Sequence, residues 1–158
     1  MRSRRALIGV SLLVILVLAA GTAHFRGRPP LSDQQKIYAL VVQAQKAVEN
    51  HNSAGLTRLL SRDYVDSYGT TRQQLVAMIV QWMHGGEEVV AVPEITDLQI
   101  REPFADMHVQ VRLWEGREPV GPGAEYALAV RLRREGRTWK VIAADGWAAA
   151  QSDVMNDE

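Results

Sequence analysis

A few side chains in this sequence have the chemistry to move a proton. Asp66 and His108 are the candidates for a general base, because a carboxylate or an imidazole can accept a proton in such a reaction. Two further aspartates and three tyrosines could assist as acids or hydrogen-bond donors: Asp63, Asp145, Tyr64, Tyr68 and Tyr126. This chemistry requires an ionisable group in a dry cavity with a shifted pKa, and the sequence matches no particular enzyme's catalytic motif.

Each of these candidates also has an ordinary structural interpretation. Asp66 and Tyr68 belong to an Asp-Ser-Tyr-Gly stretch that predicts a turn, in which the aspartate would bond to backbone amides. His108 alternates with Gln110 and Arg112, so these three side chains share one face of a predicted strand. That face is either solvated or lines a pocket, because a period of two shows which residues share a face and not which face is inside.

The sequence excludes several other kinds of site. It has no cysteine, which rules out disulfides, thiol catalysis and cysteine-based zinc sites. None of the four histidines lies at metal-ligand spacing from another, and no glycine-rich phosphate loop is present. We therefore expect neither a metal nor a cofactor. The candidates for binding a ligand are aromatic or cationic: Tyr64, Tyr68, Trp82 and Arg112.

Residues 1–30 differ from the rest of the chain. They hold five arginines and no acidic residue, although the whole chain has 18 basic and 18 acidic residues. Removing those five arginines leaves 13 basic against 18 acidic residues, a net charge of −5, which disfavours nucleic acid as a partner. Residues 6–23 form an uncharged stretch rich in leucine, valine and isoleucine. At about 1.5 Å per residue, a helix of that length spans a hydrocarbon core of ~30 Å.

We therefore expect a signal-anchor and short spacer at 1–30, a folded domain at 31–148 and a polar tail at 149–158. The first arginines favour a single-pass protein of the cytoplasmic membrane, with its N-terminus inside and its domain outside. The alternative is a cleaved signal peptide. Cleavage near Ala23 would leave a secreted or periplasmic protein.

Helical signals fill the first half of the domain. Ser32 and Gln35 predict a capping box before a helix that ends near 50–52, and Ser53 predicts the cap of a shorter second helix. Thr71 and Gln74 predict a second capping box. The third helix would run to the glycine pair at 85–86, with four apolar residues on one face: Leu75, Met78, Ile79 and Trp82.

After residue 86 the apolar period changes to two, which indicates strands. Residues 107–114, 126–133 and 139–144 alternate clearly, and a tight turn at 134–137 joins the last two as a hairpin. Residues 89–100 are also strand-like, with a slip in the alternation that predicts a bulge near Thr96-Asp97. Helices followed by a block of strands predict an α+β domain with helices on one face of an antiparallel sheet.

The order of these motifs resembles the nuclear transport factor 2-like superfamily, also described as ketosteroid-isomerase-like or polyketide-cyclase-like. The resemblance covers roughly residues 32–147. It rests on the long and short helices, the Tyr-Val-Asp-Ser-Tyr-Gly stretch at 64–69, the capped third helix and the meander that ends with Gly-Arg-Thr-Trp-Lys-Val-Ile at 136–142. It implies a curved sheet wrapped into a cone around about three helices, often with an apolar pocket in the cone.

The superfamily includes enzymes, ligand binders and structural domains, so the resemblance implies shape more than function. We expect a non-catalytic binding or interaction module of the bacterial cell envelope, held to the membrane by residues 6–23. Its partner would be a protein or a small apolar ligand, and a homodimer is a further expectation. The alternative is a small acid–base enzyme, an isomerase or dehydratase, with Asp66 or His108 as its base.

Overall fold

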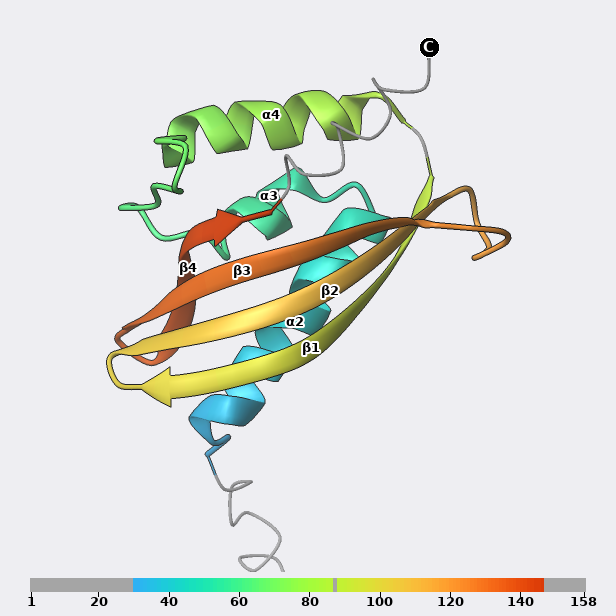
Figure 1. Cartoon of the computed structure of the whole chain (residues 1–158). Coiled ribbons are helices and arrows are strands. Elements are labelled where there is room, and N and C mark those ends of the chain that lie inside the picture. Colours follow the sequence, from blue (N-terminus) through green and yellow to red (C-terminus); the bar gives the residue numbers. More distant parts are fainter. Residues whose placement is uncertain (1–29, 87, 147–158) are drawn as a thin grey trace, which may run out of the picture. The chain divides into compact units, whose positions relative to one another are not determined.

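The computed structural model describes residues 30–86 and 88–146, which contain three helices and four strands (Figure 1). The predicted membrane segment, residues 6–23, and the predicted tail, residues 149–158, lie outside these ranges. Within them, every helix is too short or too polar to cross a membrane. The α+β class predicted from the sequence is confirmed.

Helix α2, Asp33–Glu49, begins at the predicted capping box. The Ser32 hydroxyl accepts the Gln35 amide at 3.2 Å, and the Gln35 side chain accepts the Ser32 amide at 2.9 Å. These bonds satisfy two of the amides that a helix start leaves without partners. The helix buries Ile37 and Leu40, which lie three residues apart on one face, against the sheet.

Helix α3, Ser53–Thr57, is capped by Asn52 and not by Ser53 as predicted. The side-chain oxygen of Asn52 accepts the Gly55 amide at 2.8 Å, whereas Ser53 already belongs to the first turn. The prediction was wrong by one residue because serine and asparagine are both favourable caps and adjacent candidates look alike in a sequence.

Helix α4, Arg72–His84, has the predicted capping box at Thr71 and ends at Gly85. The four apolar residues predicted to share one face of this helix are not all buried. Leu75 packs against the core, but Met78 is 60% exposed and Trp82 is 47% exposed. The inner row of the helix runs through positions 75, 79 and 83, and the neighbouring row through 78 and 82 faces solvent.

The four strands form one antiparallel sheet in the order β1-β2-β3-β4. They are β1 Val89–Arg101, β2 Phe104–Glu115, β3 Ala124–Glu135 and β4 Thr138–Asp145. The register between β1 and β2 shifts between Ile95 and Asp97, which confirms the predicted bulge. The sheet is curved, and α2 packs across one of its faces against β1 and β4 (Figure 1).

The core lies between α2 and the covered face of the sheet. Leu132 and Ala105 are fully buried there, and Trp139 is 3% exposed. The loop after α3 runs along the outer edge of β4. Its Ser61 amide donates to the Val141 carbonyl at 2.8 Å, and the Val65 amide donates to the Ile142 carbonyl at 3.0 Å. This loop therefore covers the free edge of the last strand.

Candidate functional site

The covered face of the sheet is apolar and filled with side chains. The core cluster consists of aliphatic and aromatic residues from α2 and from three of the strands, together with Tyr64. Among the residues that the structure describes, Ser61 is the one polar residue in the buried class. No aspartate, glutamate or histidine of the described ranges is buried in this interior, and Tyr64 is the ionisable side chain that the core cluster contains.

Tyr64 is the candidate that lies deepest in the fold. It is 2% exposed, and its hydroxyl donates to the Ala144 carbonyl at 3.3 Å. Burial, together with the nearby negative charge of Asp66, raises the pKa of Tyr64 to about 12. The side chain therefore stays protonated at neutral pH and holds the loop after α3 against the end of β4.

Asp66 organises the turn before α4, in agreement with the structural interpretation of the sequence. Its Oδ1 accepts the Tyr68 amide at 3.0 Å and the Thr70 amide at 2.8 Å. Asp145, at the end of β4, accepts both the amide of Ser67 at 2.9 Å and its hydroxyl at 2.6 Å. The two carboxylates thus fix one turn from two sides and leave its tip exposed.

The other candidates lie on the uncovered face of the sheet or at its edge. His108, Gln110 and Arg112 are exposed, and the Nε of Arg112 donates to Glu125 at 2.8 Å. His108 borders a hollow of about 250 Å³ whose lining includes two alanines of β3. Asp63 lies elsewhere and forms an ion pair with Arg133, with 2.7 Å between its carboxylate oxygen and the guanidinium nitrogen. Asp66 and His108 are therefore not brought together.

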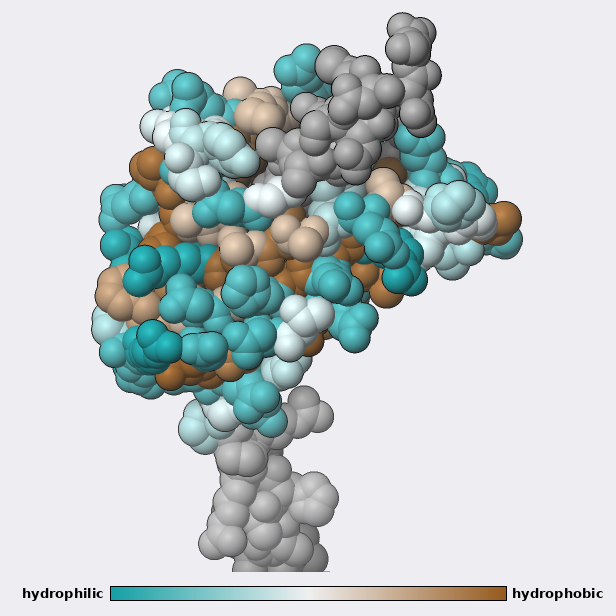
Figure 2. All heavy atoms as spheres, viewed as in Figure 1, coloured by the Kyte–Doolittle hydropathy of each residue, from teal (hydrophilic) through white to brown (hydrophobic). Residues whose placement is uncertain are grey.

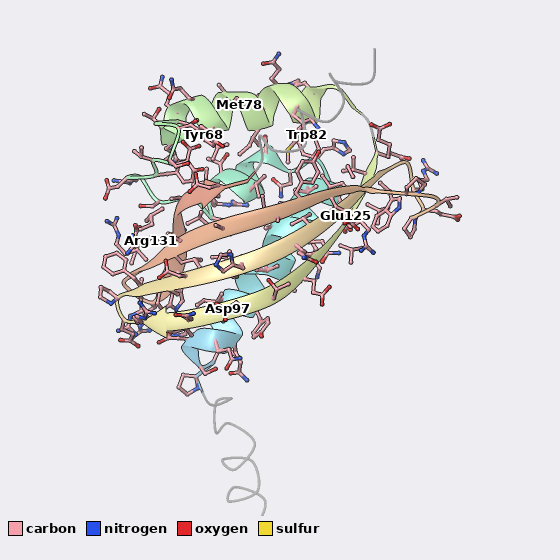
Figure 3. All side chains as sticks on the ribbon, viewed as in Figure 1. Tyr68, Met78, Trp82, Asp97, Glu125 and Arg131 are labelled. Carbon is pink, nitrogen blue, oxygen red and sulfur yellow. The ribbon has the colours of Figure 1, made fainter. Side chains whose placement is uncertain are left out.

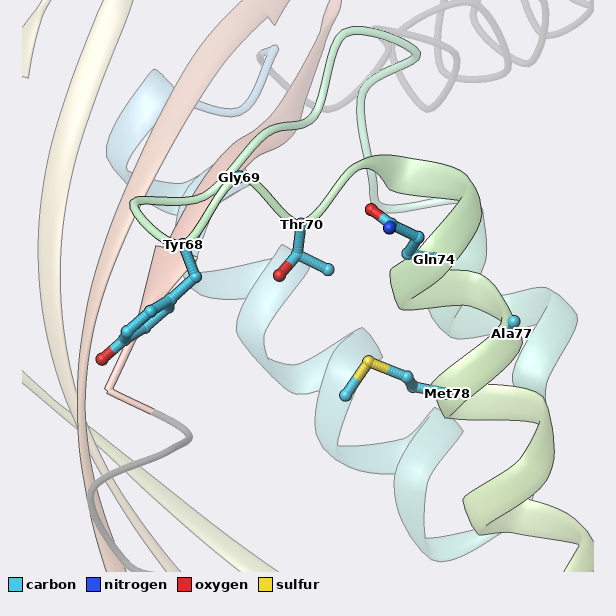
Figure 4. Close-up of a pocket in the computed structure, with 6 residues that line it drawn as sticks. All are labelled: Tyr68, Gly69, Thr70, Gln74, Ala77 and Met78. Carbon is cyan, nitrogen blue, oxygen red and sulfur yellow. The ribbon is translucent and has the colours of Figure 1, made fainter.

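A hollow of larger volume, more open to solvent, lies between the turn and α4. We call it the α4 groove, and it has a volume of about 450 Å³ (Figure 4). Its lining comes from the turn and from the first half of the helix, and none of its residues carries a charge: Tyr68, Gly69, Thr70, Gln74, Ala77 and Met78. Figure 4 shows Tyr68 on one side of the groove and Met78 on the other.

The loop before α4 and the helix itself carry several exposed apolar side chains, of which Tyr68 and Met78 line the groove. Tyr68 is 71% exposed, Met78 60% and Val65 51%, and Trp82 continues the row of Met78 one turn further along the helix. Figure 3 shows Tyr68, Met78 and Trp82 near α4. Large apolar residues grouped in this way on a surface are typical of a contact site, since burying them on a partner is favourable.

Two polar clusters were not predicted from the sequence. In the first, Ser61 donates to Glu135 at 2.6 Å, and Arg133 donates to the same carboxylate at 2.8 Å. The Ser61 hydroxyl and the Arg133 guanidinium hold the pKa of Glu135 below its usual value. These residues come from a loop and a distant hairpin, and single-sequence patterns carry no signal for such pairs.

The second cluster fixes the start of α2. Asp33 accepts hydrogen bonds from Lys36 at 2.8 Å and from the Trp139 indole at 3.2 Å, and Arg134 lies 3.3 Å from its other oxygen. The bond from Lys36, then a hydrogen bond with Glu102 and the bond from Trp139, lower the pKa of Asp33 to about 2. In the described ranges, no group of three or more acidic or histidine side chains is arranged to hold a metal ion.

Comparison with known proteins identifies the fold of the domain. No family model matches the sequence, and no curated protein matches it. Solved structures do match. A nuclear transport factor 2-like protein from Cytophaga hutchinsonii has a TM-score of 0.58 at 17% identity, over 72% of this chain and 96% of that one. The domain therefore has the nuclear transport factor 2-like fold.

Two further structures with this fold illustrate its range. A domain of unknown function with a cystatin-like fold from Nostoc punctiforme has a TM-score of 0.59 at 15% identity, over 77% of this chain and 83% of that one. A proposed dehydratase of the nuclear transport factor 2-like family from Streptomyces avermitilis has a TM-score of 0.59 at 14% identity. The match covers 71% of this chain and 93% of that one. At these identities the likeness concerns the nuclear transport factor 2-like fold alone.

Proposed function

We propose that this protein is a binding and interaction module of the bacterial cell envelope. Residues 6–23 hold it in the cytoplasmic membrane, and the α4 groove receives an apolar segment of a partner protein. The observation that carries this proposal is the uncharged groove between Tyr68 and Met78, with both side chains largely exposed. The membrane part of the proposal rests on the length and apolarity of residues 6–23 and on the arginines before them.

The composition of the groove favours a protein partner. Tyrosine, tryptophan and methionine are enriched in contact surfaces, because each buries a large area, and methionine adapts its shape to what it touches. A small apolar ligand is usually enclosed over most of its surface, whereas the α4 groove is open along one side. A row of apolar side chains on a partner would fit such an open groove better.

The contacts of the candidate bases support binding over catalysis. Asp66 already uses Oδ1 for two backbone amides, and the Tyr64 hydroxyl is bonded to a carbonyl. His108 lies on the uncovered face of the sheet. An acid–base enzyme, such as an isomerase or dehydratase, is the alternative. It would require Asp66 or Tyr64 to lose these contacts, or His108 to act at the uncovered face of the sheet.

The proposal is tested by the reactivity of Met78 in native membranes. Exposed methionines are oxidised to the sulfoxide by mild peroxide. Met78 is 60% exposed in the chain by itself, so it should be oxidised readily in purified full-length protein and be protected in membranes where the partner is present. Met83, which is 7% exposed, should react slowly in both samples and serves as the internal control. Equal oxidation of Met78 in the two samples would contradict the proposal.

A further inference from the structure

Positive charge gathers at one end of the sheet, where its two tight turns lie side by side. One turn joins β1 to β2 and the other joins β3 to β4. The Arg134 amide of the second turn donates to the Pro103 carbonyl of the first at 2.7 Å. We call this region the hairpin end, and it consists of residues 32–36, 58–63, 99–106 and 131–141 (Figure 1).

The start of α2 and the loop after α3 belong to the hairpin end because side chains of β4 bind to both. The Trp139 indole donates to the Asp33 carboxylate at 3.2 Å, which places the first turn of α2 beside the β3–β4 turn. The Nζ of Lys140 donates to the Arg58 carbonyl, which places the loop after α3 along β4. Four segments that are distant in the sequence thus form one surface.

This surface has more cations than acids. Nine of its residues are basic and five are acidic. Every one of the acids already has a cation within 3.5 Å: Asp33 and Glu102 pair with Arg134, Asp63 and Glu135 with Arg133, and Asp106 with Arg131. Five cations have no ion pair with any residue that the structure describes: Arg58, Arg62, Arg101, Arg137 and Lys140. Figure 2 shows hydrophilic side chains over much of this end, and Figure 3 labels Arg131 there.

The opposite end of the sheet carries the opposite charge. Glu115 and Glu118, at the loop between β2 and β3, are exposed and have no ion pair in the described ranges. The last turn of α2 also lies at this end, since the Glu49 carboxylate accepts the Ala91 amide at 3.3 Å. The charge of the domain is therefore polarised along its strands. An anionic surface would attract the hairpin end and repel the β2–β3 loop.

The chain enters the domain at the hairpin end. Helix α2 begins at Asp33, and nine residues separate it from the apolar stretch at 6–23. At about 3.6 Å per residue at most, these nine residues extend over no more than roughly 32 Å. A membrane that holds residues 6–23 is therefore within reach of the hairpin end, and a short tether makes even a weak contact between them effective.

We propose that the hairpin end binds the anionic headgroups of a phospholipid membrane. Arginine matches a phosphate group through paired N–H donors, and lysine attracts it as a point charge. The five unpaired cations are available for this contact without the loss of an existing ion pair. The inference rests on the proposed function for the choice of a lipid surface, because nucleic acids also attract cations.

The test uses the full-length protein with two kinds of vesicle, one of phosphatidylcholine and one in which phosphatidylglycerol replaces a third of it. The chain has no cysteine, so a single introduced cysteine can carry a fluorophore. Thr138→Cys places the fluorophore in the hairpin end, and Glu118→Cys places it in the β2–β3 loop as the control. Lipids with a quencher on the headgroup should quench the fluorophore at 138 more strongly in the anionic vesicles, and should quench the fluorophore at 118 equally in both.

Salt and charge reversal identify the contact as electrostatic. The screening length falls from about 10 Å at 0.1 M salt to about 3 Å at 1 M, so the additional quenching at 138 should be lost at the higher concentration. Each cation near an anionic surface raises binding about fivefold, so Arg137→Glu should lower the ratio of quenched to unquenched protein about tenfold or more. Lys46→Glu makes the same change of charge in the last turn of α2. It is the matched control and should leave the ratio unchanged.

The outcomes separate this inference from the proposed membrane anchor. Equal quenching at 138 in the two kinds of vesicle overturns the inference, even where flotation with both shows that residues 6–23 hold the chain. Flotation with the anionic vesicles alone, lost at high salt, supports the inference and contradicts the anchor, and flotation with neither overturns both. Equal weakening by Arg137→Glu and Lys46→Glu overturns the inference, because net charge alone then sets the binding. Binding of duplex DNA without additional quenching by anionic vesicles overturns it in favour of a nucleic acid.

Discussion

Two serines make nearly the same hydrogen bond in different surroundings. The Ser61 hydroxyl donates to Glu135 at 2.6 Å, and the Ser67 hydroxyl donates to Asp145 at 2.6 Å. Ser61 is 1% exposed, whereas Ser67 is at the surface. Replacing each serine by alanine therefore removes a bond of equal length and tests whether burial sets its contribution to stability.

The expected magnitudes follow from what each substitution leaves behind. Ser61→Ala also removes the acceptor of the Asp63 amide at 3.2 Å and of Arg133 at 3.2 Å. The Ser61 hydroxyl is buried but its partners are partly exposed, and each lost hydrogen bond contributes about 0.5–1.5 kcal/mol, so we expect a total loss of about 2 kcal/mol. After Ser67→Ala water can replace the lost contacts, and we expect a loss below about 0.5 kcal/mol.

The assay is urea unfolding of the full chain in mild detergent, followed by tryptophan fluorescence. Three of the four tryptophans lie in the part of the domain that the structure describes: Trp82, Trp114 and Trp139. With a slope of about 1.5 kcal/mol per molar urea, Ser61→Ala should lower the midpoint by about 1.3 M and Ser67→Ala by less than about 0.4 M. Equal shifts for the two variants would refute the reasoning that burial of the Ser61 cluster stabilises the loop against β3.

Two further stability predictions concern the ends of the domain. Gly146→Ala places a Cβ 2.1 Å from the Ala127 carbonyl oxygen, whereas Gly121 has a similarly positive φ and open space around it. Gly146→Ala should therefore lower the free energy of unfolding by about 1–3 kcal/mol more than Gly121→Ala does. The urea midpoints of the two variants measure the difference. The fold favours the charged form of Asp33, because its pKa is lowered from 3.8 to about 2. The stability that this carboxylate contributes is therefore complete above about pH 4 and is lost as the pH falls toward 2. Asp33→Asn should therefore lower the urea midpoint at pH 6 and have a smaller effect at pH 2.5, and a constant difference across this range would contradict the assignment.

The sequence was informative wherever local chemistry determines local structure. The capping boxes at Ser32 and Thr71 and the bulge near Asp97 were all predicted and are confirmed. These signals depend on residues within four positions of one another, or on a break in a period of two. The turn at Asp66 was predicted for the same reason.

The sequence was less informative about faces and distant pairs. Periodicity grouped Met78 with Leu75, because the two positions lie only about 60° apart around a helix, but only one of them faces the core. The α4 groove exists because Met78 faces outward beside the Tyr68 turn. The Arg133 cluster joins residues 72 positions apart, and no pattern in a single sequence connects them.

The central claim is that a partner covers the α4 groove in the native membrane. It is tested most directly by measuring Met78 oxidation in native membranes for two variants, Trp82→Lys and Val92→Lys. Trp82 and Val92 are both 47% exposed, but only Trp82 continues the row of Met78 on α4. The account predicts that Trp82→Lys weakens the partner contact and makes Met78 as reactive as in purified protein, while Val92→Lys leaves it protected. Equal protection of Met78 in the two variants would contradict the account.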